Sequence, residues 1–265
     1  MIDYRELTSN EDFTQCILLQ KEVFNFSDVD IISPLFLKLI ARNNPPIGIS
    51  MGAFELTENK LVGIIIGFAT FNSKSIYGVL QGVNPEFRNQ EIGLNLLIKL
   101  REVALNKGLE LMEGIVDPLE ANLAKLFFTN LGFNGIKYEP QAYKYTGNDI
   151  NKSIPIDKVL IKWNFNSQTT IEKINYRKGL DNVNTLNEIP IATETNKPNS
   201  ENVLIEIPND FKEVKNNDWE QALNWRNSTR EIFTHYLNQK NYIIVDFIKK
   251  LENQTFRSYY LLEKQ

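Results

Sequence analysis

The sequence contains little of the side-chain chemistry that many catalytic and metal sites use. It has one cysteine, Cys16, and one histidine, His235. A single cysteine cannot form a disulfide within the chain, which is typical of a protein from a reducing compartment. One histidine argues against a histidine-rich metal site, and the sequence has no P-loop, Cys-x-x-Cys pair or Ser-His-Asp set. We therefore expect a function without a metal, and we expect Cys16 to be a small buried residue of a helix.

Long apolar runs and an excess of basic residues are also missing. The longest apolar run, residues 61–71, is about half as long as a membrane span requires, so it predicts a buried strand. The N-terminal residues lack the pattern of a signal peptide. The formal net charge of -4 argues against nucleic acid as the main partner. We expect a cytoplasmic protein with neither membrane nor nucleic acid as a partner.

Hydrophobic periodicity predicts alternating strands and helices over the first 166 residues. The predicted strands are 2–7, 49–56, 61–71, 76–83, 109–116, 133–138 and 158–165. The short polar turns among the second to fourth of these strands predict an antiparallel meander. The predicted helices are one after Thr8, one after Pro34, one after Gly93 and one over 119–131.

Local signals place the ends of the first two helices. Thr8 and Glu11 form a capping-box pattern that opens a helix through Phe24. The second helix follows Ser33-Pro34, with Leu35, Leu39 and Ile40 as its expected buried side. Residues 43–46, Asn-Asn-Pro-Pro, should end it.

The chain becomes polar after residue 166 and apolar again at Val203. Turn-forming residues dominate 193–202, and they predict an exposed linker or a long loop. Then come a predicted strand at 203–207, a helix at 218–237 and strands at 242–248 and 257–262. We therefore expect three regions: a domain over 1–166, a polar linker over 167–202, and a compact αβ appendage over 203–265 that packs against the domain.

The most informative segment joins the fourth predicted strand to the third helix. It contains Val83-x-Pro85-x-x-Arg88, then Gly93, then an amphipathic helix that Gly108 should end. The first N–H groups of a helix lack partners within the helix, and the helix dipole is positive at that end. The segment therefore predicts an anion site at the helix N-terminus.

The motif and the order of elements resemble the GNAT superfamily of N-acyltransferases. In that family the loop that binds the coenzyme A pyrophosphate follows Arg/Gln-x-x-Gly-x-Gly/Ala, and the same frame here runs from Arg88 to Gly93. A second family signature corresponds to Asn122, Ala124, Phe128 and Gly132-Phe133. The resemblance implies an α+β fold, an α/β/α sandwich with a mixed, mostly antiparallel sheet. The appendage and Asp117-Pro118-Leu119 resemble a bacterial and archaeal branch of this superfamily, whose substrate the resemblance does not supply.

The resemblance also implies a reaction and a co-substrate. An acyl group would pass directly from acetyl-CoA, or another acyl-CoA, to a small amine or amino-acid-like acceptor, with no metal. A homodimer is possible. The residues that the resemblance assigns to the coenzyme are Val83, Arg88, Asn89, Gln90, Glu91, Ile92, Gly93, Leu94, Asn122 and Phe128. Asn122 could contact the pantetheine arm, but it could equally cap its helix.

Two positions depart from the family pattern. Glu91 stands where the loop has its first glycine. Its carboxylate could point to solvent, or it could face the diphosphate, where like charges in a partly desolvated site would cost on the order of 1 kcal/mol or more. Phe128 stands where the family has a tyrosine acid, and it has no proton to give. These departures favour an alternative function, a non-catalytic GNAT-fold ligand-binding or protein-interaction module that has lost its coenzyme site.

The sequence offers other groups for proton transfer. Tyr138 is our expected acid, and Tyr143 and Tyr145 are alternatives, although each could be an ordinary core or surface aromatic residue. Glu113 is our expected base, because it lies on the predicted fifth strand, near where the family places the acceptor amine. Asp117 is offset from it by an even number of residues, but a turn-capping role before Pro118 is the simpler interpretation.

Overall fold

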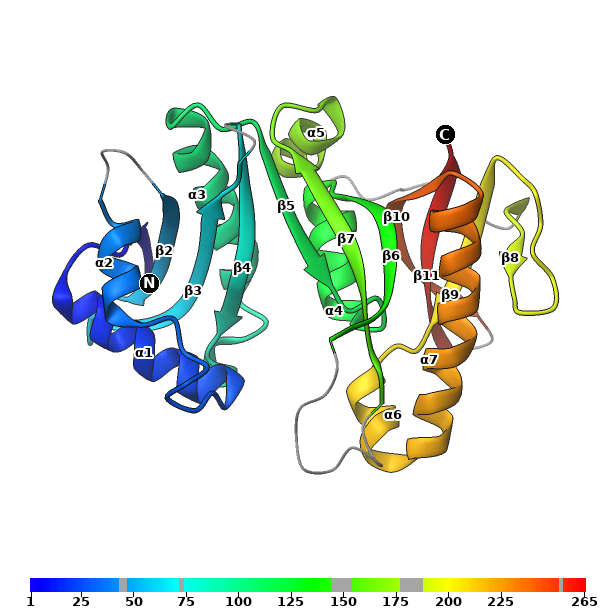
Figure 1. The fold of residues 1–265 in the computed structure, drawn as a ribbon, viewed down its shortest axis with the longest axis horizontal. Coiled ribbons are helices and arrows are strands. Elements are labelled where there is room, and N and C mark those ends of the chain that lie inside the picture. Colours follow the sequence, from blue (N-terminus) through cyan, green and yellow to red (C-terminus); the bar gives the residue numbers. More distant parts are fainter. Residues whose placement is uncertain (43–46, 72–73, 144–153, 177–187, 253–254) are drawn as a thin grey trace. The chain divides into compact units, whose positions relative to one another are not determined.

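The computed structural model describes residues 1–42, 47–71, 74–143, 154–176, 188–252 and 255–265 (Figure 1). The chain forms two compact units, Met1–Gly114 and Ile115–Gln265. The first unit contains the segment with the coenzyme motif, and the second contains the predicted appendage.

Unit 1 is built on strands in the order β1-β2-β3-β4-β5. These strands are β1 (Ile2–Glu6), β2 (Gly48–Glu55), β3 (Lys60–Ala69), β4 (Ser75–Val83) and β5 (Leu111–Val116), whose last two residues belong to unit 2. Neighbours from β1 to β4 pair antiparallel, whereas β4 and β5 pair parallel. The predicted meander and the mixed, mostly antiparallel sheet are therefore confirmed.

Helices α1 (Asn10–Phe24) and α2 (Pro34–Ile40) pack on one face of this sheet. Their shared core with the strands consists of Leu7, Phe13, Cys16, Leu19, Leu37, Ile40, Phe54, Leu61, Ile64 and Ile66. Cys16 is fully buried, as expected, and burial raises the pKa of its thiol to about 12. The thiolate form is therefore scarce at neutral pH, which fits a packing role.

The start of α1 differs by one residue from the prediction. Ser9, and not Thr8, is the N-cap residue, and its partner in the capping box is Asp12, and not Glu11. The side chain of Ser9 accepts a hydrogen bond from the backbone N–H of Asp12, and the Asp12 carboxylate accepts one from the N–H of Ser9. Both pairs fit the sequence pattern equally well, so contacts outside the helix must select between them.

The buried side of α2 also differs from the prediction. Leu37 and Ile40 are buried, whereas Leu35 is 65% exposed. The side chain of Ser33 accepts the N-cap hydrogen bond from Phe36 N–H, so the helix begins where the sequence placed it. The expected stop signal at 43–46 lies outside the described residues.

Helix α3 (Ile92–Asn106) packs on the opposite face of the sheet. A Cβ atom on Gly63 of β3 would lie 3.0 Å from Ile92 and 3.1 Å from Leu96. The next residue, Ile64, points to the core of α1 and α2, because successive side chains of a strand alternate between its faces. Gly108, with φ of 79°, follows the end of α3 in the left-handed conformation, as its predicted role as a stop requires.

The strands of unit 2 follow the order β7-β6-β10-β11-β9-β8. Its strands are β6 (Asn134–Tyr143), β7 (Ile156–Asn164), β8 (Ile191–Ala192), β9 (Asn202–Ile207), β10 (Tyr242–Glu252) and β11 (Thr255–Lys264). Its helices are α4 (Ala121–Ala124), α5 (Gln168–Tyr176), α6 (Phe211–Asn217) and α7 (Trp219–Phe233). The sequence did not predict α5 or α6, and α5 lies inside the region expected to be a linker.

Two parts of unit 2 repeat the same arrangement. Helix α4 continues into the π-helical turn Lys125–Asn130 and then β6, and α7 continues into the π-helical turn Thr234–Gln239 and then β10. Strands β6 and β10 pair antiparallel. The contacts are reciprocal: Thr129 of the first turn donates a hydrogen bond to the Phe247 carbonyl of β10, and Asn238 of the second bonds the backbone of Tyr138 in β6. The appendage thus repeats the helix, π-helical turn and strand of the preceding half of its own unit.

This pairing changes the expected division of the chain. We placed β6 in a domain ending at residue 166 and β10 in an appendage beginning at 203. In the structure both strands belong to one sheet of one unit, and the division falls at Gly114–Ile115. Composition could not reveal this division, because the pairing of β6 with β10 joins segments about a hundred residues apart in the sequence.

Candidate functional site

The loop before α3 is held by hydrogen bonds at its first residues. Asn84 is fully buried; its Nδ2 donates to Glu22 Oε1 of α1 at 2.6 Å, and its Oδ1 accepts from Glu86 N–H at 2.9 Å. Pro85–Phe87 forms a single 3₁₀ turn. The exposed side chain of Arg88 then turns back, and its Nε donates to the Val83 carbonyl at 3.3 Å. These contacts fix the position from which the chain enters α3.

The helix itself begins at Ile92, and its N-terminus lacks a side-chain cap. Its N-cap residue, Glu91, makes no side-chain capping hydrogen bond. The Gln81 side chain donates to the Gly93 carbonyl at 3.0 Å, which ties the first turn to β4. The first-turn N–H groups of a 15-residue helix therefore point to a place where an anion would find donors and a positive dipole.

Glu91 occupies the glycine position of the motif in a conformation that suits glycine. Its φ of 56° and ψ of 15° are left-handed, and Asn89 is also left-handed with φ of 62°. Asparagine tolerates this region, whereas glutamate does so at a cost of about 1–2 kcal/mol. Glu91 is also exposed, so its carboxylate remains hydrated. The loop thus keeps the backbone path that a glycine would allow.

Strand β4 leaves its neighbour β5 early. Their pairing covers only Ser75 to Tyr77 of β4, although β4 continues to Val83. The ladder between β4 and β3 also shifts register beside Val79, a β-bulge of the kind found near ligand sites. Among the described strands, the remainder of β4 is paired with β3 alone, which leaves one edge for other hydrogen bonds.

The other expected site residues have different surroundings. Glu113 is half-buried on β5. Asn122 is exposed in α4 and does not cap it, because Glu120 is the N-cap residue. Phe128 is fully buried, and its ring lies 5.5 Å from that of Tyr260 in β11. Tyr145 and the side chain of Tyr143 lie outside the described part of the chain.

Tyr138 is the centre of a buried contact. Only 1% of it is exposed, its hydroxyl donates to Asp157 Oδ2 at 2.7 Å, and its ring stacks on Phe233 at 5.5 Å. Burial, with the neighbouring Asp157 carboxylate, raises the pKa of the hydroxyl well above its usual value. The role of Tyr138 as an acid stays a prediction, and these contacts favour a structural role.

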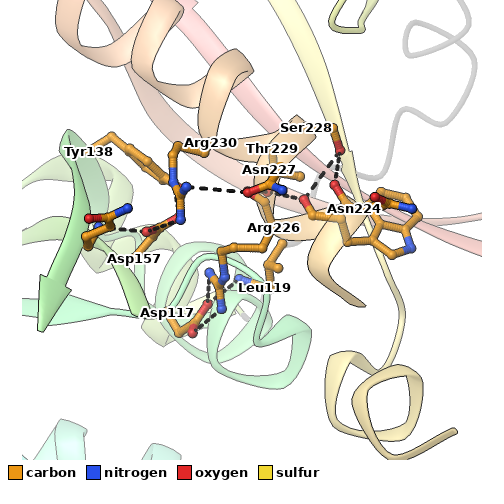
Figure 2. Close-up of polar contacts among 12 residues, drawn as sticks. Asp117, Leu119, Tyr138, Asp157, Asn224, Arg226, Asn227, Ser228, Thr229 and Arg230 are labelled. Carbon is orange, nitrogen blue, oxygen red and sulfur yellow. Dashed lines mark hydrogen bonds and ion pairs between the residues drawn. The ribbon is translucent and has the colours of Figure 1, made fainter. Parts of the chain in front are cut away.

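Two arginines of α7 extend this contact into a polar network of unit 2 (Figure 2). Arg230 binds both carboxylate oxygens of Asp157 at 3.0 Å. Arg226, one turn earlier and 2% exposed, binds both oxygens of Asp117 at 2.8 and 2.6 Å. Asp117 Oδ1 also accepts from Leu119 N–H at 2.9 Å, which confirms the turn-capping role. One turn of α7 thus separates two bidentate ion pairs.

Half-buried charges surround the Asp117–Arg226 pair. Burial raises the pKa of Glu120, and the negative charges of Asp117 and Asp210 add to that shift. Burial lowers the pKa of Lys158 in β7. Both shifts move the pKa of the group toward neutral pH. Such shifts occur in catalytic sites and in structural charge networks alike.

The sequence analysis missed these arginines, although a signal was present. Arg226 shares the buried face of α7 with Ala222, Thr229 and Phe233, at the helical spacing of four, three and four residues. An arginine at a core position requires a buried partner. The spacing could therefore have predicted that Arg226 pairs with a carboxylate. It could not have predicted that this carboxylate belongs to Asp117.

Comparisons with known proteins agree with this geometry at the level of fold. No protein-family model and no curated protein matches the sequence. An acetyltransferase of the GNAT family from Streptococcus pneumoniae is 16% identical, with 61% of this chain and 98% of that chain covered and a TM-score of 0.50. The chain has the GNAT fold. A probable acetyltransferase from Staphylococcus epidermidis is 19% identical, with 62% and 99% covered and a TM-score of 0.49.

The GNAT fold accounts for the elements around the motif. The expected α+β class is confirmed. Within the described residues there is no cluster of three or more His, Cys, Asp or Glu side chains suited to a metal ion. The same part of the chain has no helix of the length and apolar character that crossing a membrane requires.

Proposed function

We propose that this GNAT-fold chain is an acyl-CoA-dependent N-acyltransferase that acts on a small amine or amino-acid-like acceptor. The N-terminus of α3, which has no side-chain cap and lies in the Arg88–Gly93 motif, is the observation that carries the proposal. The diphosphate of the coenzyme would accept hydrogen bonds from the N–H groups of the first turn. Arg88 would supply a nearby cation. The unpaired edge of β4 would bind the amides of the pantetheine arm.

The proposed reaction is a direct transfer. The acceptor nitrogen forms a bond to the thioester carbonyl carbon, the carbon–sulfur bond breaks, and the thiolate leaves and takes up a proton. The acceptor must lose its ammonium proton before it attacks. We assign the removal of that proton to Glu113, whose half-buried carboxylate on β5 would accept it. Tyr138 is not assigned the second proton transfer, because its hydroxyl is buried against Asp157.

The alternative is a GNAT-fold module that binds a ligand without catalysis. The burial of Phe128 favours it, since a side chain without an acidic proton fills the position of the family's acid. In that case coenzyme A would bind, or fail to bind, without any acyl transfer. Binding and turnover must therefore be measured separately.

Calorimetric titration with coenzyme A and acetyl-CoA at fixed salt tests the coenzyme site. Arg88→Ala should weaken binding by roughly three- to tenfold, because a cation next to a diphosphate contributes on the order of 1 kcal/mol in partly exposed surroundings. Glu91→Gly should strengthen it by less than about threefold, because a hydrated carboxylate repels the diphosphate only weakly. Lys38→Ala removes an exposed cation of α2 and is the matched control.

The outcomes separate the two functions. Binding that depends on Arg88 but not on Lys38, together with acyl transfer to an amine, supports the enzyme. Binding without turnover across a panel of amines and amino acids supports the module. Failure of the wild type and of Glu91→Gly to bind either ligand would refute the coenzyme site.

A further inference from the structure

Unit 2 contains a basic cavity that the proposed acyl transfer does not use. Its volume is about 320 Å³, within the lower range of small-molecule sites. The side chains that define it come from four places: the segment before β9, the π-helical turn after α7, β10 and β11. They are Lys197, His235, Tyr236, Lys240, Tyr242 and Lys264.

The two tyrosines form a fixed wall. Their rings lie 4.9 Å apart at 78°. The Tyr236 hydroxyl donates to the Pro198 carbonyl at 2.8 Å, and the Tyr242 hydroxyl donates to the Ser200 carbonyl at 2.5 Å. Both tyrosine residues are about 1% exposed, so the wall is part of the core and exists before any ligand binds.

The three lysines are only partly neutralised. Lys197 pairs with Glu231 of α7. Lys264 donates to the side-chain oxygen of Asn199 at 3.0 Å, a neutral partner. Lys240 is exposed and forms no ion pair within the described residues. The charges near the cavity therefore sum to a cationic site, even with Glu201 close to Tyr242.

The pKa of His235, the only histidine, depends on the charges around the cavity. Partial burial lowers its pKa, and the positive charges of Lys197 and Lys240 lower it further, against smaller opposite effects of Gln239 and Glu231. The imidazole therefore experiences more positive than negative charge. A bound anion would reverse that balance.

We propose that this cavity binds a compact, phosphate-bearing small molecule. Three ammonium groups can each turn a donor toward tetrahedral phosphate oxygens, and lysine commonly binds phosphate as a point charge. This site is separate from the N-terminus of α3, which belongs to unit 1.

The test follows His235 by NMR, because a single histidine gives one set of imidazole signals that needs no residue assignment. Inorganic phosphate and pyrophosphate are titrated at constant ionic strength, with chloride as the balancing anion. The His235 resonance should move to saturation, pyrophosphate should bind more tightly than phosphate, and the pKa of His235 should rise in the complex. The paired variant Lys240→Gln/Lys264→Gln should weaken pyrophosphate binding at least tenfold.

Two controls keep the result specific. Lys249→Gln removes an exposed lysine about 20 Å farther along β10 and should leave the titration unchanged. Arg88→Ala should also leave it unchanged, which separates this site from the coenzyme site. A linear, unsaturable shift of His235, or equal loss of binding in Lys249→Gln, would overturn the proposal. A near-ultraviolet circular dichroism spectrum equal to that of the wild type confirms that each variant is folded.

Discussion

Asp12 connects the first strand, the first turn and the first helix of unit 1. Its carboxylate accepts two hydrogen bonds from the Arg5 guanidinium, at 3.0 and 2.8 Å, and one each from the N–H groups of Thr8 and Ser9, at 3.0 and 2.9 Å. Only 3% of the residue is exposed. Burial alone would raise the pKa of Asp12, but these four donors outweigh it and hold the pKa well below its usual value.

Asp12→Asn should lower the free energy of unfolding at pH 7 by about 2–4 kcal/mol, because hydrogen bonds to a charged group are lost or weakened. A depressed pKa stabilises the fold above the ordinary aspartate pKa of about 3.9, and this stabilisation is lost as the pH falls through the folded-state pKa. Urea unfolding from pH 7 down to pH 2.5 measures the difference between the proteins. A difference that stays constant across this range would contradict the assigned charge.

Helix α7 attaches to the rest of unit 2 through Arg226. Arg226→Ala leaves Asp117 without its bidentate partner, so the free energy of unfolding should fall by about 3–5 kcal/mol. The buried Nε atom of Arg226 has no hydrogen-bond partner within the described part of the chain. The free energy of removing this N–H group from water is therefore not compensated in the native ion pair.

That cost predicts how a double variant behaves. Asp117→Asn/Arg226→Met should be less destabilised than the sum of its single variants, with a coupling of about 1–3 kcal/mol. Asn224→Ala, at an exposed position of the same helix, should change stability by less than about 0.5 kcal/mol. Chemical denaturation of the wild type, Arg226→Ala, the double variant, its two single variants and Asn224→Ala provides the comparison, and additivity of the single variants would refute direct coupling.

At the scale of the molecule, the division at Gly114–Ile115 predicts that the appendage is not a removable domain. A chain that ends at Asn166 leaves β6 without β10, Phe128 without Tyr260 and Tyr138 without Phe233. It should lose its cooperative thermal transition and bind a hydrophobic dye, because apolar core residues become exposed.

Differential scanning calorimetry and near-ultraviolet circular dichroism of that shortened chain, beside the full chain, test this expectation. Addition of a separate chain of residues 167–265 should restore the near-ultraviolet signal if the missing contacts are the cause. A sharp, cooperative transition in the chain that ends at Asn166, with unchanged aromatic signals, would instead support the domain boundary that composition suggested.

The sequence by itself determined the features that depend on neighbouring residues. The antiparallel meander follows from alternating apolar runs and short polar turns. The limits of α3 follow from its apolar periodicity, the motif before it and Gly108 after it. The GNAT fold could therefore be predicted from the order of these elements, and the comparison with solved structures agrees.

The tertiary structure decided what depends on residues far apart in the chain. The sequence offers two equally good capping boxes, Thr8 with Glu11 and Ser9 with Asp12. In the structure the Asp12 carboxylate accepts a hydrogen bond from Arg5 of β1, which selects the second box. Likewise, only the tertiary structure shows that β6 and β10 pair within one unit, and only the approach of α7 to the turn after β5 gives Arg226 its carboxylate. Local pattern carries no information about such contacts, because their free energy depends on which distant groups the complete fold brings together.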